Sequence, residues 1–232
     1  MTQKVCLVTA AGRGIGAACA REMHARGYAM VLMSPSENCE VLARELGGQA
    51  HRGVGQSEAD LKALVDLALA THGRIDAVLN HTGHPPKGDL LDIADDHWNL
   101  AHDMILKSVI RMARLATPAM QAQGGGSIVN ITTYASHEPS LMFPASCTYR
   151  AAVSTFTKLY ADRYGADGIR MNCLAPGFTD SLDVGKFADQ TALKRIGTVA
   201  EQAKAAAFLL TPDSSYVTGQ TLRVDGGITR SV

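Results

Sequence analysis

Short apolar runs alternate with longer helix-like stretches along almost the whole of this 232-residue chain. The apolar runs are continuous rather than alternating, which is typical of strands buried on both faces of a parallel sheet. Strands are expected near 4–9, 29–33, 50–54, 76–80, 127–132, 169–174 and 220–224, and helices near 14–26, 37–47, 58–72, 96–122, 145–164 and 199–210. This order predicts an α/β fold, a doubly wound parallel sheet of about seven strands, as one domain over residues 1–232.

Composition narrows the possible functions. The chain has 22 basic and 22 acidic residues, so it lacks the charge excess typical of nucleic-acid or membrane-surface binding. No apolar stretch approaches the roughly 18 residues that a membrane helix needs. The 5 cysteines show no C-x-x-C spacing, and a strand-like run from Val5 leaves no room for a signal peptide. We therefore expect a cytoplasmic protein with a small-molecule substrate.

A glycine-rich loop follows the first expected strand. It runs Thr9-Ala10-Ala11-Gly12-Arg13-Gly14-Ile15-Gly16, and a helix is expected to open within it. Glycines let the backbone approach a pyrophosphate closely, and the helix N-terminus offers unpaired N–H groups. A strand, such a loop and a helix in this order indicate a Rossmann-type dinucleotide site.

The loop resembles the T-G-x-x-x-G-x-G motif of the short-chain dehydrogenase/reductase family, with Ala10 at the first glycine. Asp76–Gly83 looks like the strand of that family ending in N-N-A-G, and Asn172–Gly177 like its N-x-x-x-P-G. Segments 216–220 and 224–227 resemble its closing motif, so the similarity runs from about residue 4 to 227. The resemblance implies that cofactor binding involves the loop and later residues: Thr9, Gly12, Arg13, Gly14, Ile15, Gly16, Ser34, Asn80, Gly83, Arg150, Pro176, Gly177 and Ser181.

Two positions favour NADP over NAD. NAD sites typically carry an acidic residue at the end of the second strand, where this chain has Ser34. Arg13 stands where NADP-preferring members often place a basic residue, and a guanidinium there suits a 2′-phosphate. A solvated arginine on an exposed loop is the alternative, and NAD stays possible. The third strand ends in Gly53-Val54-Gly55, which offers no carboxylate near the adenine.

The resemblance also implies an asparagine, a serine, a tyrosine and a lysine around the nicotinamide, and all four are replaced. Arg150 opens a run that aligns with the K-A-A-V of the family and takes the lysine position. Counting back places Ser146 at the tyrosine, Thr133 at the serine and Ile105 at the asparagine. Thr133 keeps a hydroxyl and Arg150 a positive charge able to bond ribose hydroxyls. Ser146 is the severe change, because an aliphatic hydroxyl is far less acidic than a phenol.

Several nearby groups are candidates to replace the lost proton donor. Tyr149 lies three residues after Ser146, although a packed aromatic at a helix interface explains it too. His81, His84 and His137 follow expected strands, and histidine suits proton transfer at neutral pH. Each of them alone is also explained as a solvated or structural histidine. His81 and His84 lack nearby acidic ligands, so we expect no metal site.

Three functions remain open. The first is an NAD(P)(H)-dependent, NADP-preferring oxidoreductase acting on a small apolar carbonyl, alcohol or imine, with Thr133, Ser146, Arg150 and Tyr149 as candidate catalytic residues. An iminium substrate would need no proton on the product nitrogen. The second is a catalytically silent nucleotide-binding or regulatory protein. The third is a cofactor-independent lyase or dehalogenase, although halohydrin dehalogenases keep the tyrosine and lose the glycine loop.

The surroundings of the site and the assembly are also expectations. Segment 178–196 has weak periodicity and suits a mobile lid. The pocket is expected to be lined by that lid and a mostly apolar set, His84, Thr133, Met142 and Phe143. A homodimer or homotetramer is expected from the resemblance. Candidate interface residues, which ordinary core packing explains equally well, are Val109, Met112, Leu115, Val153, Phe156 and Leu159.

Overall fold

A computed structural model describes residues 3–232, which form one domain around a seven-stranded parallel sheet. The strands are β1 (Val5–Thr9), β2 (Ala29–Ser34), β3 (Gln49–Arg52), β4 (Ala77–Asn80), β5 (Gly126–Ile131), β6 (Ile169–Pro176) and β7 (Thr221–Val224). Their order across the sheet is β3-β2-β1-β4-β5-β6-β7. The order reverses between β1 and β4, and such a switch point opens a crevice at the carboxyl ends of the strands. The predicted fold is confirmed.

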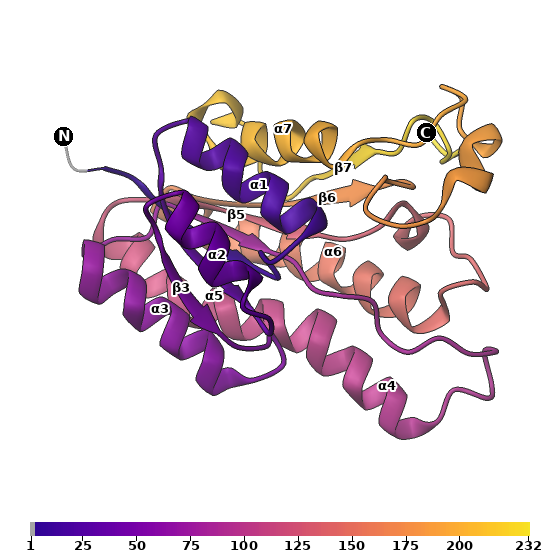
Figure 1. The fold of residues 1–232 in the computed structure, drawn as a ribbon, viewed down its shortest axis with the longest axis horizontal. Coiled ribbons are helices and arrows are strands. Elements are labelled where there is room, and N and C mark those ends of the chain that lie inside the picture. The colour runs from indigo at the N-terminus through magenta and orange to yellow at the C-terminus, as the bar shows by residue number, and fades with distance from the viewer. Residues whose placement is uncertain (1–2) are drawn as a thin grey trace.

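Helices cover both faces of the sheet (Figure 1). One face carries α1 (Gly14–Ala25), α2 (Asn38–Glu45) and α7 (Val199–Leu210), and α1 lies beside α7. The other face carries α3 (Glu58–His72), α5 (Ser108–Ala122) and α6 (Pro144–Tyr164). Four short 3-10 helices occur at Tyr134–Ser136, Gly165–Asp167, Gly185–Gln190 and Pro212–Ser214.

The helix expected over 96–122 is interrupted. It begins as α4 (Asp95–His102), passes through a π-helical turn at Asp103–Lys107 and continues as α5. The Ser108 hydroxyl donates to the carbonyl oxygens of Met104 at 2.7 Å and Ile105 at 3.3 Å. Such side-chain bonds to backbone carbonyls compete with the regular helix pattern. The π turn widens the helix at Ile105, which the sequence analysis aligned with the asparagine of the family.

Part of the expected subunit interface belongs to the core instead. Val109, Met112 and Val153 are at most 5% exposed and pack into hydrophobic clusters of this chain. For these three residues the structure supports ordinary core packing, the alternative that the sequence analysis left open. Both helices turn their most apolar stripe toward the sheet, which leaves Leu159, 63% exposed, on the outside.

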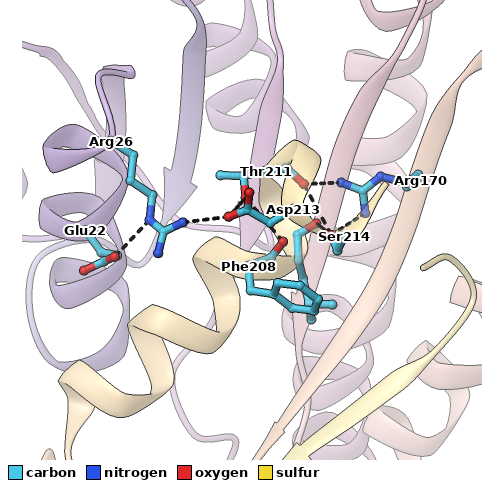
Figure 2. Close-up of polar contacts among 8 residues, drawn as sticks. Glu22, Arg26, Arg170, Phe208, Thr211, Asp213 and Ser214 are labelled. Atoms are coloured by element: carbon cyan, nitrogen blue, oxygen red, sulfur yellow. Dashed lines mark hydrogen bonds and ion pairs between the residues drawn. The ribbon is translucent and has the colours of Figure 1, made fainter. Parts of the chain in front are cut away.

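A polar network ties the sheet to α1 and α7 at the amino ends of the strands (Figure 2). Arg170 in β6 donates to the Thr211 carbonyl oxygen at 2.9 Å and to the Ser214 hydroxyl at 2.9 Å. Arg26, at the end of α1, pairs with Asp213 at 3.2 Å. Burial lowers the pKa of Arg170, and its bond to the Thr211 carbonyl oxygen adds a donor at the C-terminal end of α7. The network holds the far end of α1, whose first turn faces the glycine loop.

Candidate nucleotide and substrate site

The glycine loop adopts a conformation that only small residues allow. Gly14 has φ +56°, and a Cβ added at Gly16 would lie 2.3 Å from the carbonyl oxygen of Ala10. Ala10 itself has φ 49°, in the left-handed region that disfavours side chains. A Cβ at Gly12 would lie 2.7 Å from the Ser34 hydroxyl oxygen. The loop thus packs tightly against Ala10 and Ser34. Helix α1 begins at Gly14 with no side-chain cap.

Thr9 joins the two strands at the switch point. Its hydroxyl donates to the His81 carbonyl oxygen at 2.7 Å and accepts from the His81 amide at 2.8 Å. These bonds fix the ends of β1 and β4 side by side. The arrangement gives Thr9 a structural reason for its place in the motif.

Arg13 and Ser34 are the two residues from which the sequence analysis expected a preference for the 2′-phosphate of NADP. Arg13 is exposed at the N-cap of α1, and within residues 3–232 its side chain makes no hydrogen bond or ion pair. Ser34 is buried at the end of β2, and its hydroxyl donates to the Ser36 carbonyl oxygen at 3.0 Å. No carboxylate bonds to either side chain in this part of the chain.

A carboxylate does lie beside the end of β3, although it comes from outside the strand. Asp60 in α3 accepts from the Val54 amide at 2.9 Å, and a Cβ added at Gly53 would lie 2.7 Å from Asp60. The Val54 amide lowers the pKa of Asp60. Asp60 lies on the following helix, outside the end of the third strand, so sequence reasoning missed it. The Ser57 N-cap, whose hydroxyl accepts from the Asp60 amide, was the available signal.

The remaining residues of the expected cofactor site gather at the same carboxyl edge. Asn80 donates to the Asn130 side-chain oxygen at 2.8 Å, which fixes the end of β4 against β5. Pro176 ends β6, and a Cβ at Gly177 would lie 2.7 Å from the Asp225 Cα. Two more members lie near the loop and near Arg150 respectively. Ser181 lies close to Gly14, because a Cβ added at Gly14 would lie 3.2 Å from the Cβ of Ser181. The Gly83 carbonyl oxygen accepts from Arg150 at 3.4 Å.

Arg150 and Ser146 form one buried unit on the first turns of α6. The Nε of Arg150 donates to the Ser146 Oγ at 3.1 Å, and its Nη1 donates to the carbonyl oxygens of Ile131 and Thr132. With the Nη2 bond to Gly83, these contacts leave one guanidinium N–H without a partner among the described residues. Burial lowers the pKa of Arg150 to about 10, so it stays charged at neutral pH. The guanidinium mainly holds the backbone ends of β4 and β5.

Two other residues of the expected reaction site, Thr133 and Ile105, differ in their surroundings. Thr133 caps the short helix after β5, where its hydroxyl accepts from the Ala135 amide at 3.3 Å. Ile105 is 2% exposed and packs with Val109, Val153 and Cys173. Thr133 therefore keeps a polar group near the strand ends, whereas Ile105 contributes only apolar packing.

The ring of Tyr149 packs against α4. Its centroid lies 5.9 Å from that of Trp98, in an edge arrangement, and 5.3 Å from that of His102. Ser146 lies in a different lining, with His84 and Phe143. The ring contacts therefore fit the alternative that the sequence analysis left open for Tyr149, a packed aromatic at a helix interface. An aromatic side chain packed between two helices buries more area than one exposed at the surface.

The three candidate histidines occupy different environments. Burial, then Arg150 and His84, lower the pKa of His81 to about 3, and its Nδ1 is buried without a partner in residues 3–232. His84 is exposed overall, yet partial burial and then Arg150, Lys87 and Arg13 lower its pKa. His137 is exposed and its Nδ1 lies 3.3 Å from the Ser136 hydroxyl. His84 alone shares a pocket with Ser146.

The pocket beside Ser146 differs from the expected one. Its lining is His84, Pro85, Pro86, Lys87, Phe143 and Ser146. Thr133 and Met142 do not belong to this lining. Met142 is 48% exposed, because α6 starts at Pro144 and Met142 points outward. Lys87 was missed, although its place in the loop directly after β4 was a signal. The lining thus contains one lysine that the expected set did not include.

A second hollow lies deeper, below the strand ends. Its lining combines the switch point, the π turn and α6: Thr9, Gly55, Leu61, Asn80, His81, Thr82, Ile105, Ser108, Val109, Ile131, Arg150 and Val153. The unpartnered Nδ1 of His81 belongs to this region. Nowhere in residues 3–232 do three histidine, cysteine or acidic side chains gather as metal ligands would. Among the described helices, none combines the length and apolarity of a membrane span.

Segment 178–196 lies over this edge of the sheet. Its Phe178 ring stacks on Phe187 at a centroid distance of 4.4 Å and contacts Tyr134 at 5.5 Å. A single parallel bridge joins Thr179 to Gly197. The segment is thus packed by its own aromatic side chains next to Thr133.

Sequence comparisons match the chain to known proteins over nearly its full length. The family model described as enoyl-(acyl carrier protein) reductase matches residues 9–229. A short-chain reductase protein, NovJ of Streptomyces niveus, is 32% identical over 97% of this chain and 94% of its own length. The cis-4-hydroxycyclohexanecarboxylate dehydrogenase of Sinomonas cyclohexanicum is 34% identical over 98% and 97%. Human dehydrogenase/reductase SDR family member 4 is 31% identical over 98% and 88%.

Solved structures share the fold at lower identity. L-Sorbose reductase from Gluconobacter frateurii, complexed with NADPH and L-sorbose, superposes with a TM-score of 0.92 at 24% identity, over 100% of this chain and 98% of that chain. YwfH, an NADPH-dependent reductase involved in bacilysin biosynthesis, gives 0.95 at 22% identity, with complete coverage of both chains. At these identities the likeness concerns the fold.

Proposed function

The chain belongs to the short-chain dehydrogenase/reductase family of oxidoreductases, and we propose that it uses NADP(H) to interconvert a small carbonyl or imine compound with its reduced form. The glycine loop carries this proposal. Side chains at Gly12 and Gly16 would collide with Ser34 and Ala10, and helix α1 opens uncapped directly behind the loop. A tight loop before a helix N-terminus fits a pyrophosphate.

The preference for NADP rests on Arg13. Its guanidinium has no partner in residues 3–232, and no carboxylate stands at Ser34 to bond ribose hydroxyls. A charged, unpaired donor set suits the 2′-phosphate, which adds about two negative charges to the cofactor. The NADPH-bound neighbour with the same fold is consistent with this choice.

The residues of the chain orient the reacting groups. The bound nicotinamide would supply the hydride, which is the chemistry of the cofactor itself. Ser146 Oγ accepts the Nε–H of Arg150, so its own proton is free to point toward a substrate oxygen. The charged guanidinium stabilises negative charge that develops on that hydroxyl. Thr133 offers a second hydroxyl at the carboxyl edge.

A proton is needed when the substrate is a ketone or aldehyde. We propose that Ser146 donates its hydroxyl proton to the carbonyl oxygen and regains one through His84, which lines the same pocket. His84 is neutral near pH 7 because burial and nearby cations lower its pKa. In the oxidation direction it accepts the proton instead. An iminium substrate would need no proton on nitrogen, so the same site would reduce it with Ser146 as a positioning group.

Catalytic silence is the second candidate function. Ile105 in the core and an Arg150 tied to backbone carbonyls are features that nucleotide binding alone would tolerate. A protein of this kind would bind NADPH and turn over nothing.

We also propose that the chain assembles as a homodimer or homotetramer through α5 and α6, which light scattering can test.

The test begins with cofactor affinity. NADPH and NADH are titrated into the wild type, Arg13→Ala and Arg44→Ala. Arg44 is an exposed arginine on α2 whose side chain forms no hydrogen bond or ion pair within residues 3–232. Loss of one phosphate contact should weaken NADPH binding about tenfold or more and leave NADH unchanged. Equal effects on both cofactors would contradict the NADP preference, and absence of binding would contradict the proposed function.

Turnover is then measured on a panel of ketones, aldehydes, alcohols and cyclic imines. Ser146→Ala should lower kcat/KM for carbonyl substrates roughly 10- to 100-fold without changing NADPH affinity. Imine reduction should fall much less. NADPH binding without turnover of any panel member would favour the silent protein instead.

A further inference from the structure

The pocket beside Ser146 has one charged wall. Lys87 belongs to the loop after β4, and Phe143 immediately precedes α6 on the opposite side. The Lys87 Nζ lies 5.1 Å from the centroid of the Phe143 ring. Pro85 and Pro86 precede it and restrict the backbone of the loop. The ammonium group is therefore placed at the pocket by a stiff segment and an aromatic face.

Lys87 is one of several lysines without an acidic partner within residues 3–232. Lys62, Lys107 and Lys158 each pair with an aspartate one helical turn away. Within residues 3–232 Lys87 forms no ion pair, and its ammonium group lies over the ring of Phe143. Its charge is thus available to a ligand.

The other charges that reach the pocket have the same sign. His84 lines it, and the charged groups that act on His84 are Arg150, Lys87 and Arg13, all of them cationic. The proposed NADP site would use Arg13, and Arg150 is bonded to carbonyl oxygens and Ser146. Lys87 remains as the one full positive charge on this wall without an assigned partner. An anion entering the pocket would therefore be attracted by these cations and would meet no acidic side chain among the described lining residues.

We propose that this pocket is an anion subsite, in which Lys87 binds a carboxylate of the substrate while the reacting carbon lies near Ser146. The substrate class is then an oxo acid, with the corresponding hydroxy acid as its reduced form. This inference rests on the proposed function and deepens it. Phe143, Pro85 and Pro86 supply apolar surface for the hydrocarbon between the two functional groups.

A carboxylate fits this wall better than a phosphate monoester. The free charge in the pocket is a single ammonium group, which matches one negative charge. A phosphate monoester carries about two near neutral pH and would leave part of its charge uncompensated beside proline and phenylalanine side chains. Selectivity for carboxylates over phosphates is part of the proposal.

The test compares oxo acids with their own methyl esters, which differ only in the charge. The carboxylate of each acid lies roughly one to four carbons from the carbonyl group. Each acid and its ester are titrated calorimetrically into the NADP⁺-saturated protein. Wild type, Lys87→Met, Lys87→Arg and Lys204→Met are compared, because Lys204 is an exposed lysine on α7, away from the pocket. A phosphate monoester of a hydroxyketone forms a separate arm.

The wild type should bind at least one oxo acid about tenfold more tightly than its ester. Lys87→Met should reduce that preference about fivefold or more, whereas Lys87→Arg and Lys204→Met should retain it. The preference should also weaken as salt is raised. NADP⁺ affinity serves as the internal control and should be the same in all four proteins.

Three outcomes overturn the subsite: no acid preferred over its ester, a preference that Lys87→Met leaves intact, or tighter binding of the phosphate monoester. In each of them NADP⁺ binding and turnover of neutral ketones can persist, so the proposed function would stand. If NADP⁺ itself fails to bind, the proposed function fails. The acid and ester titrations then proceed on the free protein, and the same comparison decides the subsite.

Discussion

Arg150 donates from its Nε to the Oγ of Ser146, four residues earlier on α6, at 3.1 Å. The remaining bonds of the guanidinium run to carbonyl oxygens of Gly83, Ile131 and Thr132, which lie on two other segments. One side chain therefore connects the proposed reaction site to the carboxyl ends of β4 and β5. Its charge orients Ser146, and its donors satisfy backbone groups in a buried region.

The first prediction concerns this connection. Arg150→Met should lower the free energy of unfolding by about 2–3 kcal/mol, because buried carbonyl oxygens lose their donors. Arg150→Lys should lower the free energy of unfolding less than Arg150→Met, because the ammonium group keeps the charge. Some loss should remain, because the ammonium group cannot reach all four acceptors. Urea denaturation measures both, with Arg114→Met on the exposed side of α5 as the matched control. A loss no larger than that of the control would show that these bonds contribute nothing to stability.

The second prediction concerns Tyr149. Because its ring packs against Trp98 and His102, Tyr149→Phe should keep turnover within about twofold of the wild type, in the absence of any proton-transfer role. Tyr149→Ala should lower the free energy of unfolding by roughly 2–3 kcal/mol through lost packing. Kinetics on the substrate found in the panel and chemical denaturation provide the two readouts. Loss of activity in Tyr149→Phe would instead show that the phenol takes part in the reaction.

The third prediction concerns strain in the nucleotide loop. Ala10 has φ 49°, a conformation that costs an L-residue roughly 1–2 kcal/mol, whereas glycine adopts it freely. After subtraction of the greater chain entropy of glycine, Ala10→Gly should stabilise the protein by about 0.5–1 kcal/mol. Gly14→Ala should do the opposite, because φ is +56° there and the new Cβ would lie 3.2 Å from Ser181. Thermal unfolding distinguishes the pair, and a destabilised Ala10→Gly would argue against strain at this position.

The fourth prediction concerns acid stability. Burial lowers the pKa of His81 from 6.5 to about 3, so its folded form stays neutral where the unfolded chain takes up a proton. The stabilising contribution is complete above the unfolded pKa and declines as pH falls toward the folded one. Between about pH 6.5 and 4.5, the wild type should lose roughly 2 kcal/mol more stability than His81→Asn.

Denaturation midpoints at several pH values check this expectation. His24→Asn, at an exposed position on α1, controls for the loss of an imidazole. Parallel stability curves for the wild type and His81→Asn would mean that His81 is protonated in the fold, for example through a group that reaches its Nδ1.

Much of the fold could be predicted because local signals agreed with the tertiary structure. The helices expected at 58–72 and 199–210 have the observed bounds, and both begin at side-chain caps, Ser57 and Thr198. The apolar runs became strands within two residues at each end. In these elements periodicity and capping act within a few residues of sequence, so no distant partner is needed to place them.

The candidate site was less accessible to sequence reasoning. The partners of Arg150 come from the loop after β4, the end of β5 and α6, and no local pattern shows that a guanidinium will turn toward their carbonyl oxygens. Asp60 reaches the end of β3 from the next helix. The ring of Tyr149 follows the position of α4, which depends on the π turn. Each of these contacts is decided by packing between segments far apart along the chain.

The π turn at Asp103–Lys107 also bears on how the chain tolerates changes in length. In a regular α-helix each residue turns the chain by about 100°, so removing one residue from this segment would rotate α4 by that angle relative to α5. Trp98 and His102 would then leave the ring of Tyr149. A one-residue deletion, usually considered a small edit, would here act as a large reorientation of the wall that faces α6.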